Sequence, residues 1–295
     1  MGGHRFDSQI YSLYSASTLQ GRSASEVFQT HVLEREFDPR EIVMRESRDS
    51  AANPESTPVI IGLDVTGSMG MVLNATIRNI GTLMETIYDR RPITDPHIMC
   101  MGIGDVAAGD NAPLQVTQFE ADIKIAEQLQ RIYIERGGGG NGSESYTLPW
   151  YFAATKTSTD CFEKRGKKGY IFTVGDEPIN GYLTRSDIDR VCGNPPEQQQ
   201  LSARELYAMV SEKYYVYHLM VEEGNYMSSR RSVVVNSWTD VIGEQAIVLP
   251  DHNKLVETIV TAIMINEGSF AEDAIRSWND DAANSLSLSF NLRRD

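Results

Sequence analysis

The sequence has few cysteines and no long apolar run. Only three cysteines occur in 295 residues, they lie far apart, and no two form a Cys-x-x-Cys pair: Cys100, Cys161 and Cys192. This pattern excludes a disulfide framework and a zinc knuckle as the source of stability. No stretch approaches the roughly 18 consecutive apolar residues that predict a transmembrane helix. The segment Met1–Asp7 is too polar for a secretory signal.

Basic residues are also scarce. The chain has 27 Lys and Arg against 41 Asp and Glu, which gives a formal net charge of −14 and an isoelectric point near 4.8. Phosphate backbones and anionic membrane surfaces both attract basic protein faces, so this composition argues against nucleic-acid and membrane partners. A chain of this length buries a sizeable core without covalent staples. We therefore expect a globular, cytoplasmic protein.

Apolar runs typical of buried strands alternate along the chain with segments of helical periodicity. The clearest strand is Val59–Leu63, a continuous apolar run. In the segment that follows, apolar residues recur every three or four positions, at Leu73, Ile77, Ile80, Met84 and Ile87. Further strands are expected at 97–104, 114–119, 169–175, 214–221 and 246–249, and further helices at 122–135, at 203–212 and after residues 145 and 251. This alternation predicts a doubly wound α/β domain, a mainly parallel sheet with helices on both faces, over residues 57–268.

The two ends of the chain lie outside this alternation. Residues 1–56 are predicted to be an N-terminal arm that packs on the domain, with a helix near Ser23–Arg35; the alternative is a separate binding element. In the C-terminal tail, residues 269–295, four apolar side chains alternate with polar ones: Leu286, Leu288, Phe290 and Leu292. That alternation predicts a strand, either at the edge of the domain's own sheet or offered to the sheet of a partner.

Oxygen-bearing side chains follow the first strand. Asp64, Thr66 and Ser68 are two residues apart, so a turn can aim one carboxylate and two hydroxyls at one point. These are hard ligands of the kind that Mg²⁺ or Mn²⁺ prefers. Gly67 permits unusual dihedral angles in the turn, and Gly70 permits close packing where the next helix begins. The alternative is a helix-capping loop without a metal.

Two more segments bring acidic side chains to the same predicted edge of the sheet. One is the end of the strand at 169–175, and the other is the glycine-rich connection that precedes residue 145. The carboxyl ends of parallel strands meet at one edge, so these loops converge with Asp64 if the first and fourth strands are neighbours. The candidate ligands on the two segments are Ser143, Glu144, Ser145, Asp176 and Glu177, and Asp105, after the second strand, is expected at the rim or in a solvated turn.

The Asp64-x-Thr66-x-Ser68 spacing resembles the Asp-x-Ser/Thr-x-Ser signature of von Willebrand factor A domains. The similarity covers about residues 56–268 and includes the glycine-rich loop and the late strand-end aspartate. The chain looks most like the stand-alone intracellular members of bacteria and their phages. The resemblance implies a six-stranded, mainly parallel sheet and a metal-ion-dependent adhesion site. In that site Asp64, Thr66 and Ser68 bind the cation, and Asp176 binds it, often through water.

The second loop departs from the family pattern. The family has a threonine there, whereas this sequence has Glu144 at that position, with Ser143 and Ser145 as near alternatives. Asp64 and Asp176 alone neutralise a divalent ion. A coordinating Glu144 makes the site net negative and disfavours an incoming carboxylate. Either a serine is the ligand and Glu144 faces outward, or the site has a structural or different ligand role.

The resemblance implies metal-dependent protein binding rather than catalysis, with an acidic side chain of the partner completing the coordination of Mg²⁺ or Mn²⁺. It suggests as partner a MoxR-type AAA+ ATPase or another component of a bacterial or phage assembly. Two other classes stay open. One is a structural or assembly subunit that uses the domain as a scaffold. The other is a Mg²⁺-dependent phosphohydrolase or nucleotide-binding protein, whose general base or nucleophile would be Asp105 or Glu177.

Overall fold

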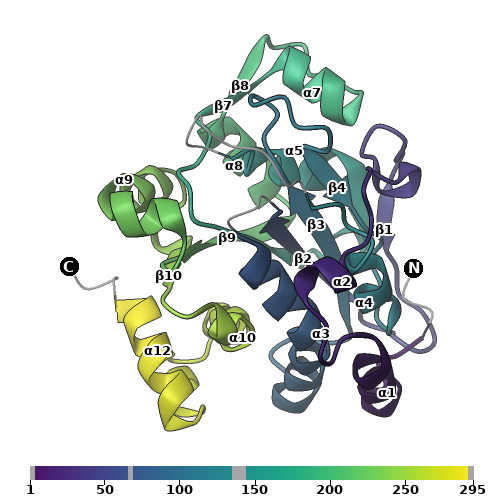
Figure 1. Ribbon diagram of the computed structural model, residues 1–295, viewed down its shortest axis with the longest axis vertical. Helices are drawn as coiled ribbons and strands as arrows, with labels where there is room; N and C mark the ends of the chain where they lie inside the picture. Colours follow the sequence, from purple (N-terminus) through teal and green to yellow (C-terminus); the bar gives the residue numbers. More distant parts are fainter. Residues whose placement is uncertain (1–3, 66–68, 135–143, 292–295) are drawn as a thin grey trace.

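A six-stranded sheet runs through the middle of the molecule (Figure 1). The computed structural model describes residues 4–65, 69–134 and 144–291. The strands, in spatial order, are β10 (Ala246–Leu249), β9 (Tyr214–Val221), β6 (Gly169–Gly175), β2 (Thr57–Asp64), β3 (Pro96–Ile103) and β4 (Leu114–Val116). All neighbouring pairs are parallel except β3 with β4, which is antiparallel. The predicted doubly wound α/β fold is confirmed.

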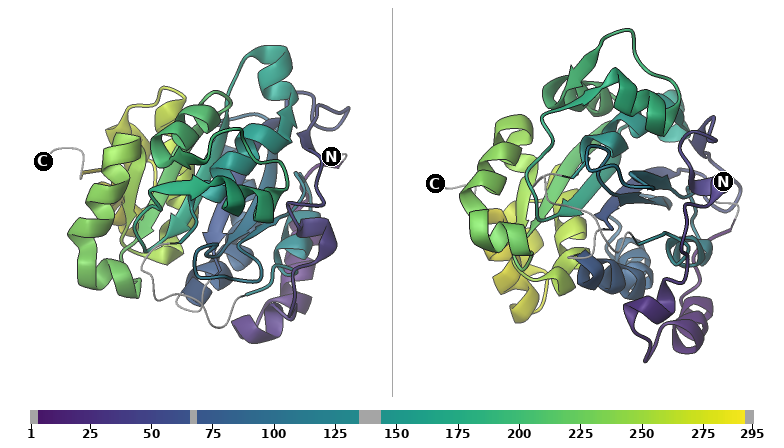
Figure 2. Two further views of the ribbon diagram at one scale, coloured as in Figure 1. Left: turned by 90° about the horizontal axis from the view of Figure 1, so that it is seen from above. Right: turned by 45° about the horizontal axis from the view of Figure 1, so that its top comes forward.

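Helices cover both faces of this sheet (Figure 2). One face carries α1 (Ser8–Thr18), α3 (Gly70–Arg90), α4 (Lys124–Leu129), α10 (Leu255–Asn266) and α12 (Asp280–Asn291); the other carries α5 (Thr147–Lys156), α7 (Arg185–Cys192), α8 (Ala203–Ser211) and α9 (Asn225–Ile242). Successive side chains of a strand point to opposite faces. Val59 and Ile61 therefore pack among the helices on the first face and Ile60 among those on the second. Because both faces of β2 are buried, its sequence is continuously apolar.

Short elements complete the fold around this framework. Two strand pairs lie outside the main sheet: β1 (Arg45–Ser47) is parallel to β5 (Thr157–Thr159), and β7 (Tyr182–Thr184) is antiparallel to β8 (Gln200–Ser202). The short helices are α2 (Ala24–Val27), α6 (Asp160–Arg165) and α11 (Ala271–Arg276), with 3₁₀ turns at Arg35–Phe37, Gly243–Gln245 and His252–Lys254. None of the helices in the described part of the chain combines the length and apolarity that crossing a bilayer requires.

Two predicted helices are much shorter than expected. The helix expected over Ser23–Arg35 is only α2, because its apolar residues do not share one continuous face: Val27 and Phe28 are buried, whereas Val32 is exposed. The helix expected over 122–135 ends at Leu129. Downstream, the side-chain amide of Gln115, a residue of β4, exchanges two hydrogen bonds with the backbone of Tyr133 and ties that residue to β4.

The strand predicted in the C-terminal tail is wrong, because this segment forms helix α12. The same segment also contains apolar residues at a four-residue spacing, namely Ala282, Leu286 and Phe290. The side chains of all three are buried. Four-residue spacing places side chains on one helix face, and that face packs on β10 and α10. Leu288, which the strand reading places beside Leu286 and Phe290, is instead exposed.

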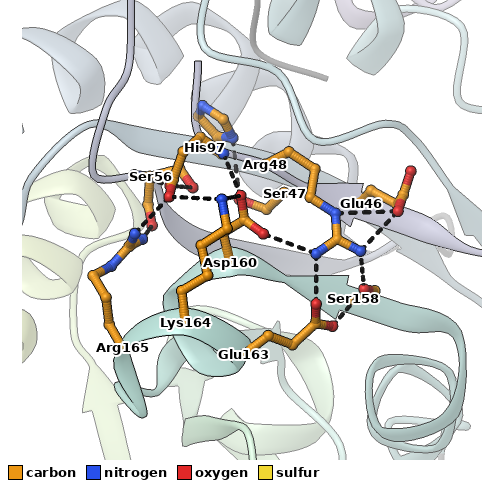
Figure 3. A network of polar contacts seen from close by, with 11 residues as sticks. Glu46, Ser47, Arg48, Ser56, His97, Ser158, Asp160, Glu163, Lys164 and Arg165 are labelled. Carbon is orange, nitrogen blue, oxygen red and sulfur yellow. Dashed lines mark hydrogen bonds and ion pairs between the residues drawn. The ribbon is translucent and has the colours of Figure 1, made fainter. Parts of the chain in front are cut away.

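An ionic network fastens the segment before β2 to the rest of the molecule (Figure 3). At its centre, Asp160 of α6 accepts hydrogen bonds from the Arg48 guanidinium and the Asp49 backbone N–H, both at 2.9 Å, and pairs with Lys164 at 2.7 Å. The Arg165 guanidinium in turn pairs with the Asp49 carboxylate at 2.7 Å. Because β1 also pairs with β5, backbone contacts hold this segment against β5 and side-chain contacts hold it against α6.

Two buried cations fix the same segment from the other side. The ammonium of Lys156, a residue only 4% exposed, donates to the carbonyls of Pro39, Ile42 and Cys192 at 2.7, 2.8 and 2.7 Å. The guanidinium of Arg45 donates to the carbonyls of Glu36 and Val116. Buried charges persist only with such partners. Residues 36–45 are therefore an integral part of the packed structure.

Candidate metal centre

Three adjacent strands bring acidic residues to one edge of the sheet. Asp64 is the last residue of β2, Asp176 follows β6, and Asp105 lies two residues after β3. Since β2 lies between β6 and β3, all three carboxylates meet at the same carboxyl edge. The condition set by the sequence, that the first and fourth parallel strands be neighbours, is met by β2 and β6. The other predicted residues Thr66, Gly67, Ser68 and Ser143 lie outside the described residues.

Asp64 is almost completely enclosed. Its exposed fraction is 1%, and its Oδ2 accepts a hydrogen bond of 3.0 Å from the Tyr146 hydroxyl. Tyr146 directly precedes α5, so the loop that contains Glu144 and Ser145 supplies the residue that orients Asp64. At Gly70, the first residue of α3, an added Cβ would meet no described atom within 4 Å, so the described residues show no close packing there.

Asp176 is held by the start of helix α9. Its Oδ2 accepts a hydrogen bond of 2.9 Å from the Tyr226 backbone N–H, while its Oδ1 is buried and has no hydrogen-bond partner among the described residues. Gly224 allows the two segments to approach this closely, because a Cβ at that position would lie 2.1 Å from the Cβ of Asp176. One oxygen of Asp176 is thus held by a backbone N–H. The other is buried, and no hydrogen-bond donor among the described residues satisfies it.

Glu144 and Ser145 differ in what their side chains do. Glu144 is 1% exposed, and its Oε2 is buried with no hydrogen-bond partner in the described part of the chain. The Ser145 hydroxyl is engaged by the loop after β3: it accepts from the Val106 N–H at 2.9 Å and donates to Asp105 Oδ1 at 3.2 Å. Of these two candidates in the second loop, Glu144 is the one that presents an unsatisfied oxygen inward.

Asp105 and Glu177 play unequal parts. The Asp105 carboxylate accepts the backbone N–H groups of Ala107 and Ala108 at 2.8 and 3.0 Å, which makes it an organiser of its own turn. Glu177 has a buried Oε2 with no hydrogen-bond partner among the described residues. Its backbone carbonyl accepts a hydrogen bond of 3.0 Å from the indole N–H of Trp238. Glu177 therefore adds another carboxyl to the enclosed edge.

The crowding of carboxyl groups perturbs their protonation. Burial, followed by the charges of Asp64, Glu177 and Asp105, raises the pKa of Glu144 to about 10. Burial and the charges of Asp64 and Asp176 raise the pKa of Glu177 to about 7, and burial raises the pKa of Asp176. Like charges in a dry site disfavour the ionised forms of one another. A divalent cation would relieve this repulsion, and the hard carboxylate oxygens fit Mg²⁺ or Mn²⁺.

A second group of metal-ligating side chains lies farther along the same edge. Among the described residues, only Glu223, Asp251 and His252 bring three such ligand atoms within 4.8 Å of one another. The carboxylates of Asp64, Glu144 and Asp176 are therefore spaced too widely for all three to contact one small ion directly. This spacing is compatible with a site in which water bridges one carboxylate to the cation.

Three ring side chains to which the sequence analysis assigned no role pack together next to Asp64. The Tyr146 ring packs edge-on against His218 at 5.0 Å and Trp238 at 5.4 Å, and the last two rings stack at 3.5 Å. His218 is fully buried and bonds Thr173 through Nδ1, and burial holds its pKa well below the usual value. Tyr146 ends the glycine-rich loop but has no role in its motif, and Gly224 and Tyr226 belong to no recognisable motif, because the roles of all three arise from contacts across the fold.

The pH dependence of stability provides a test of the crowded carboxyl groups. Both raised pKa values lie above the ordinary value of 4.5, so the unfolded chain loses these protons first. Their contribution to stability is complete below pH 4.5 and is lost as the pH rises through about 7 for Glu177 and about 10 for Glu144. For Glu177 alone, we expect the metal-free protein to lose on the order of 2 kcal/mol between about pH 5 and pH 8, and Glu144 adds to this decline over the same range.

Denaturant unfolding in the presence of a chelator measures this loss. The variant Glu177→Gln should flatten the decline between about pH 5 and pH 8. Glu205→Gln serves as the matched control, because Glu205 is an exposed helix-capping residue far from the site in sequence. Metal-free stability that rises over this pH range would contradict the electrostatic description of the site.

No protein-family model and no curated protein matches the sequence. Among solved structures, the chain is similar to the pilus adhesin SpaC from Lactobacillus rhamnosus GG, with 9% identity and a TM-score of 0.42 over 79% of this chain and 31% of the adhesin. It is similar to proximal thread matrix protein 1 from the mussel byssus, solved with a zinc-occupied MIDAS motif, with 12% identity and a TM-score of 0.40 over 77% and 47% of the two chains.

A third similar structure is the conserved hypothetical protein BatB from Bacteroides thetaiotaomicron. The identity is 14% and the TM-score 0.41, over 72% of this chain and 98% of BatB. The present chain thus spans about a third of the adhesin and about half of the byssus protein. These likenesses are distant and concern the arrangement of the sheet and helices alone.

Proposed function

We propose that this protein is a divalent-metal-dependent protein-interaction module of the von Willebrand factor A type. In this proposal Mg²⁺ or Mn²⁺ binds at the carboxyl edge of β2 and β6, and an acidic side chain of a partner completes the coordination. The observation that carries the proposal is the pair of buried carboxylate oxygens, Glu144 Oε2 and Asp176 Oδ1, that lack a hydrogen-bond partner among the described residues. Buried polar atoms normally have partners, so such atoms from two separate loops support a cation.

Each described residue has a part in this proposal. Asp64 and Asp176 supply the two charges that neutralise a divalent ion, and Asp176 reaches the ion directly or through water. A carboxyl that binds the ion directly must give up its proton, so in this proposal Glu144 contributes from the second loop through a bridging water and stays neutral. A neutral Glu144 adds no third negative charge, so an incoming carboxylate is still attracted. Thr66 and Ser68, outside the described residues, would add the hydroxyl ligands expected from the sequence.

The partner follows only from the family resemblance. We propose an acidic segment of a MoxR-type AAA+ ATPase, or of another component of a bacterial or phage assembly, as the binding partner in the cytoplasm. The proposed site is electrostatically suited to carboxylates only when the metal is bound. Binding of such a partner should therefore disappear in the presence of a chelator.

Water-proton relaxation with Mn²⁺ tests the proposed function directly. Mn²⁺ at an open site keeps exchangeable waters, so the loaded protein should enhance the relaxation rate. A short glutamate-containing peptide should then lower the enhancement by displacing a bound water, and its glutamine counterpart should not. Binding of Mn²⁺ without any effect of the acidic peptide would contradict an adhesion-type site and leave a closed structural one.

The competing proposal is a Mg²⁺-dependent phosphohydrolase. It is favoured by one observation, the buried Oε2 of Glu177 near the charges of Asp64 and Asp176, an environment that raises the pKa of Glu177 to about 7 and so suits a general base near neutral pH. Asp105, the other candidate base, already accepts two backbone N–H groups. Turnover of p-nitrophenyl phosphate that requires Mg²⁺ and is lost in Glu177→Gln would favour the enzyme over the binding module.

A further inference from the structure

We infer that Tyr146 makes the proposed site selective for the small cations Mg²⁺ and Mn²⁺ over Ca²⁺, by restricting Asp64 to coordination through a single oxygen. The inference rests on the proposed metal site and adds the residue that determines which ion it accepts. Tyr146 touches no reacting group and acts through Asp64, so it is a positioning residue.

The hydroxyl of Tyr146 is directed at one specific oxygen of the Asp64 carboxylate, at the end of β2. It donates to Asp64 Oδ2 at 3.0 Å, in an environment where both residues are almost fully buried. A tyrosine phenol is un-ionised at neutral pH, so Tyr146 keeps the proton that it donates. Oδ2 is thereby engaged before any cation arrives.

The surrounding structure leaves this hydroxyl little freedom to move. The Tyr146 ring is fixed by edge-on contacts with His218 and Trp238. Its backbone is fixed one residue earlier, where the Ser145 N–H donates to the Gly104 carbonyl at 3.2 Å. Gly175, at the end of β6, provides the space for the hydroxyl, because a Cβ there would lie 2.0 Å from the Tyr146 oxygen.

The two classes of cation place different demands on Asp64. Ca²⁺ takes about six to eight oxygens at roughly 2.3–2.6 Å and commonly uses both oxygens of a carboxylate. Mg²⁺ requires an octahedron at roughly 2.0–2.1 Å and takes a single oxygen from each carboxylate. A cation that chelates both oxygens of Asp64 must compete with the Tyr146 hydroxyl for Oδ2, whereas a cation that uses one oxygen need not. The hydrogen bond therefore costs Ca²⁺ more than Mg²⁺.

Metal titrations of the full chain test this selectivity. Calorimetric titration with MgCl₂, MnCl₂ and CaCl₂ gives the ratio of the Ca²⁺ and Mg²⁺ dissociation constants for each protein. We expect Tyr146→Phe, which removes only the hydroxyl, to shift this ratio by about tenfold in favour of Ca²⁺, the effect of losing one buried hydrogen bond. Tyr214→Phe is the matched control: it removes a buried hydroxyl that bonds Thr157 at 2.7 Å, at the amino end of β9, and should leave the ratio unchanged.

A second variant keeps the test decisive if Tyr146→Phe does not fold. Gly175→Ala keeps the tyrosine but places a Cβ where its hydroxyl now lies, so the ratio should shift in the same direction. A wild-type protein that binds none of these ions refutes the proposed function itself. A wild-type protein that binds Mg²⁺, together with variants whose Ca²⁺ to Mg²⁺ ratio is unchanged, refutes the role of Tyr146 and leaves the proposed function standing.

Discussion

Replacement of Asp64 by asparagine is expected to abolish the stabilisation that Mg²⁺ or Mn²⁺ gives the protein and to raise the unfolding temperature of the metal-free form. The first effect follows because Asp64 is the charged residue of the first loop. The second follows because the Asp64 carboxylate is buried and its charge opposes ionisation of Glu144 and Glu177. An uncharged amide of similar shape removes that repulsion.

Thermal unfolding measures both effects. A cation present at about 100 times its dissociation constant stabilises the folded state by roughly 2.7 kcal/mol. In a protein of this size that corresponds to a shift of roughly 4 °C or more. The wild type should show this shift, and Asp64→Asn should not. Without metal, the variant should unfold at a higher temperature than the wild type, a sign that a purely structural role of Asp64 would not give.

The group Glu223, Asp251 and His252 provides the control for this experiment. If the stabilising ion binds at that group, His252→Ala should lose the shift and Asp64→Asn should keep it. We expect the reverse. A shift that survives in both variants would place the ion elsewhere and contradict the candidate metal centre.

Replacement of Lys156 by methionine is expected to be the most destabilising of the single changes considered. Methionine keeps the aliphatic length of the side chain but cannot donate to the carbonyls of Pro39, Ile42 and Cys192. An unsatisfied buried polar group costs roughly 1–3 kcal/mol, so three such carbonyls should cost at least about 3 kcal/mol. We expect the unfolding temperature to fall by roughly 5 °C or more.

Lys124→Met is the matched control for Lys156, because Lys124 is an exposed lysine at the start of α4. It should leave the unfolding temperature within about 1 °C of the wild type. Limited proteolysis gives a second readout, since loss of the Lys156 contacts should expose the chain near residue 40 to cleavage. Equal stability of the two variants would mean that the three carbonyls are not a principal anchor of this segment.

The main sheet was predictable because its strands and helices carry strong local signals. β2 and β6 are continuous apolar runs, and α3 repeats apolar residues every three or four positions over 21 residues. The tail was mispredicted because its Leu-Ser alternation satisfies a period of two while Ala282, Leu286 and Phe290 satisfy a helix equally well. Only the packing of α12 against β10 and α10 decides between the two periods.

The candidate site was predictable only where a residue ends a strand. Asp64 and Asp176 could be placed on one edge because both follow apolar runs, and the neighbouring positions of β2 and β6 bring them together. Tyr146 and Gly224 could not be found in this way. Their roles depend on hydrogen bonding and steric clearance between segments about 80 and 50 residues apart in the sequence, and no local pattern reports such contacts.

The ionic network between Arg48 and Asp160 also affects the timing of folding. The two residues are 112 positions apart, so a ribosome that adds about 5–20 residues per second makes Asp160 on the order of ten seconds after Arg48. During that interval the segment around β1 lacks both β5 and its ionic partners on α6. The nascent chain therefore carries an unpaired segment that chaperones and proteases can reach. A segment that is synthesised early is therefore among the last to become protected.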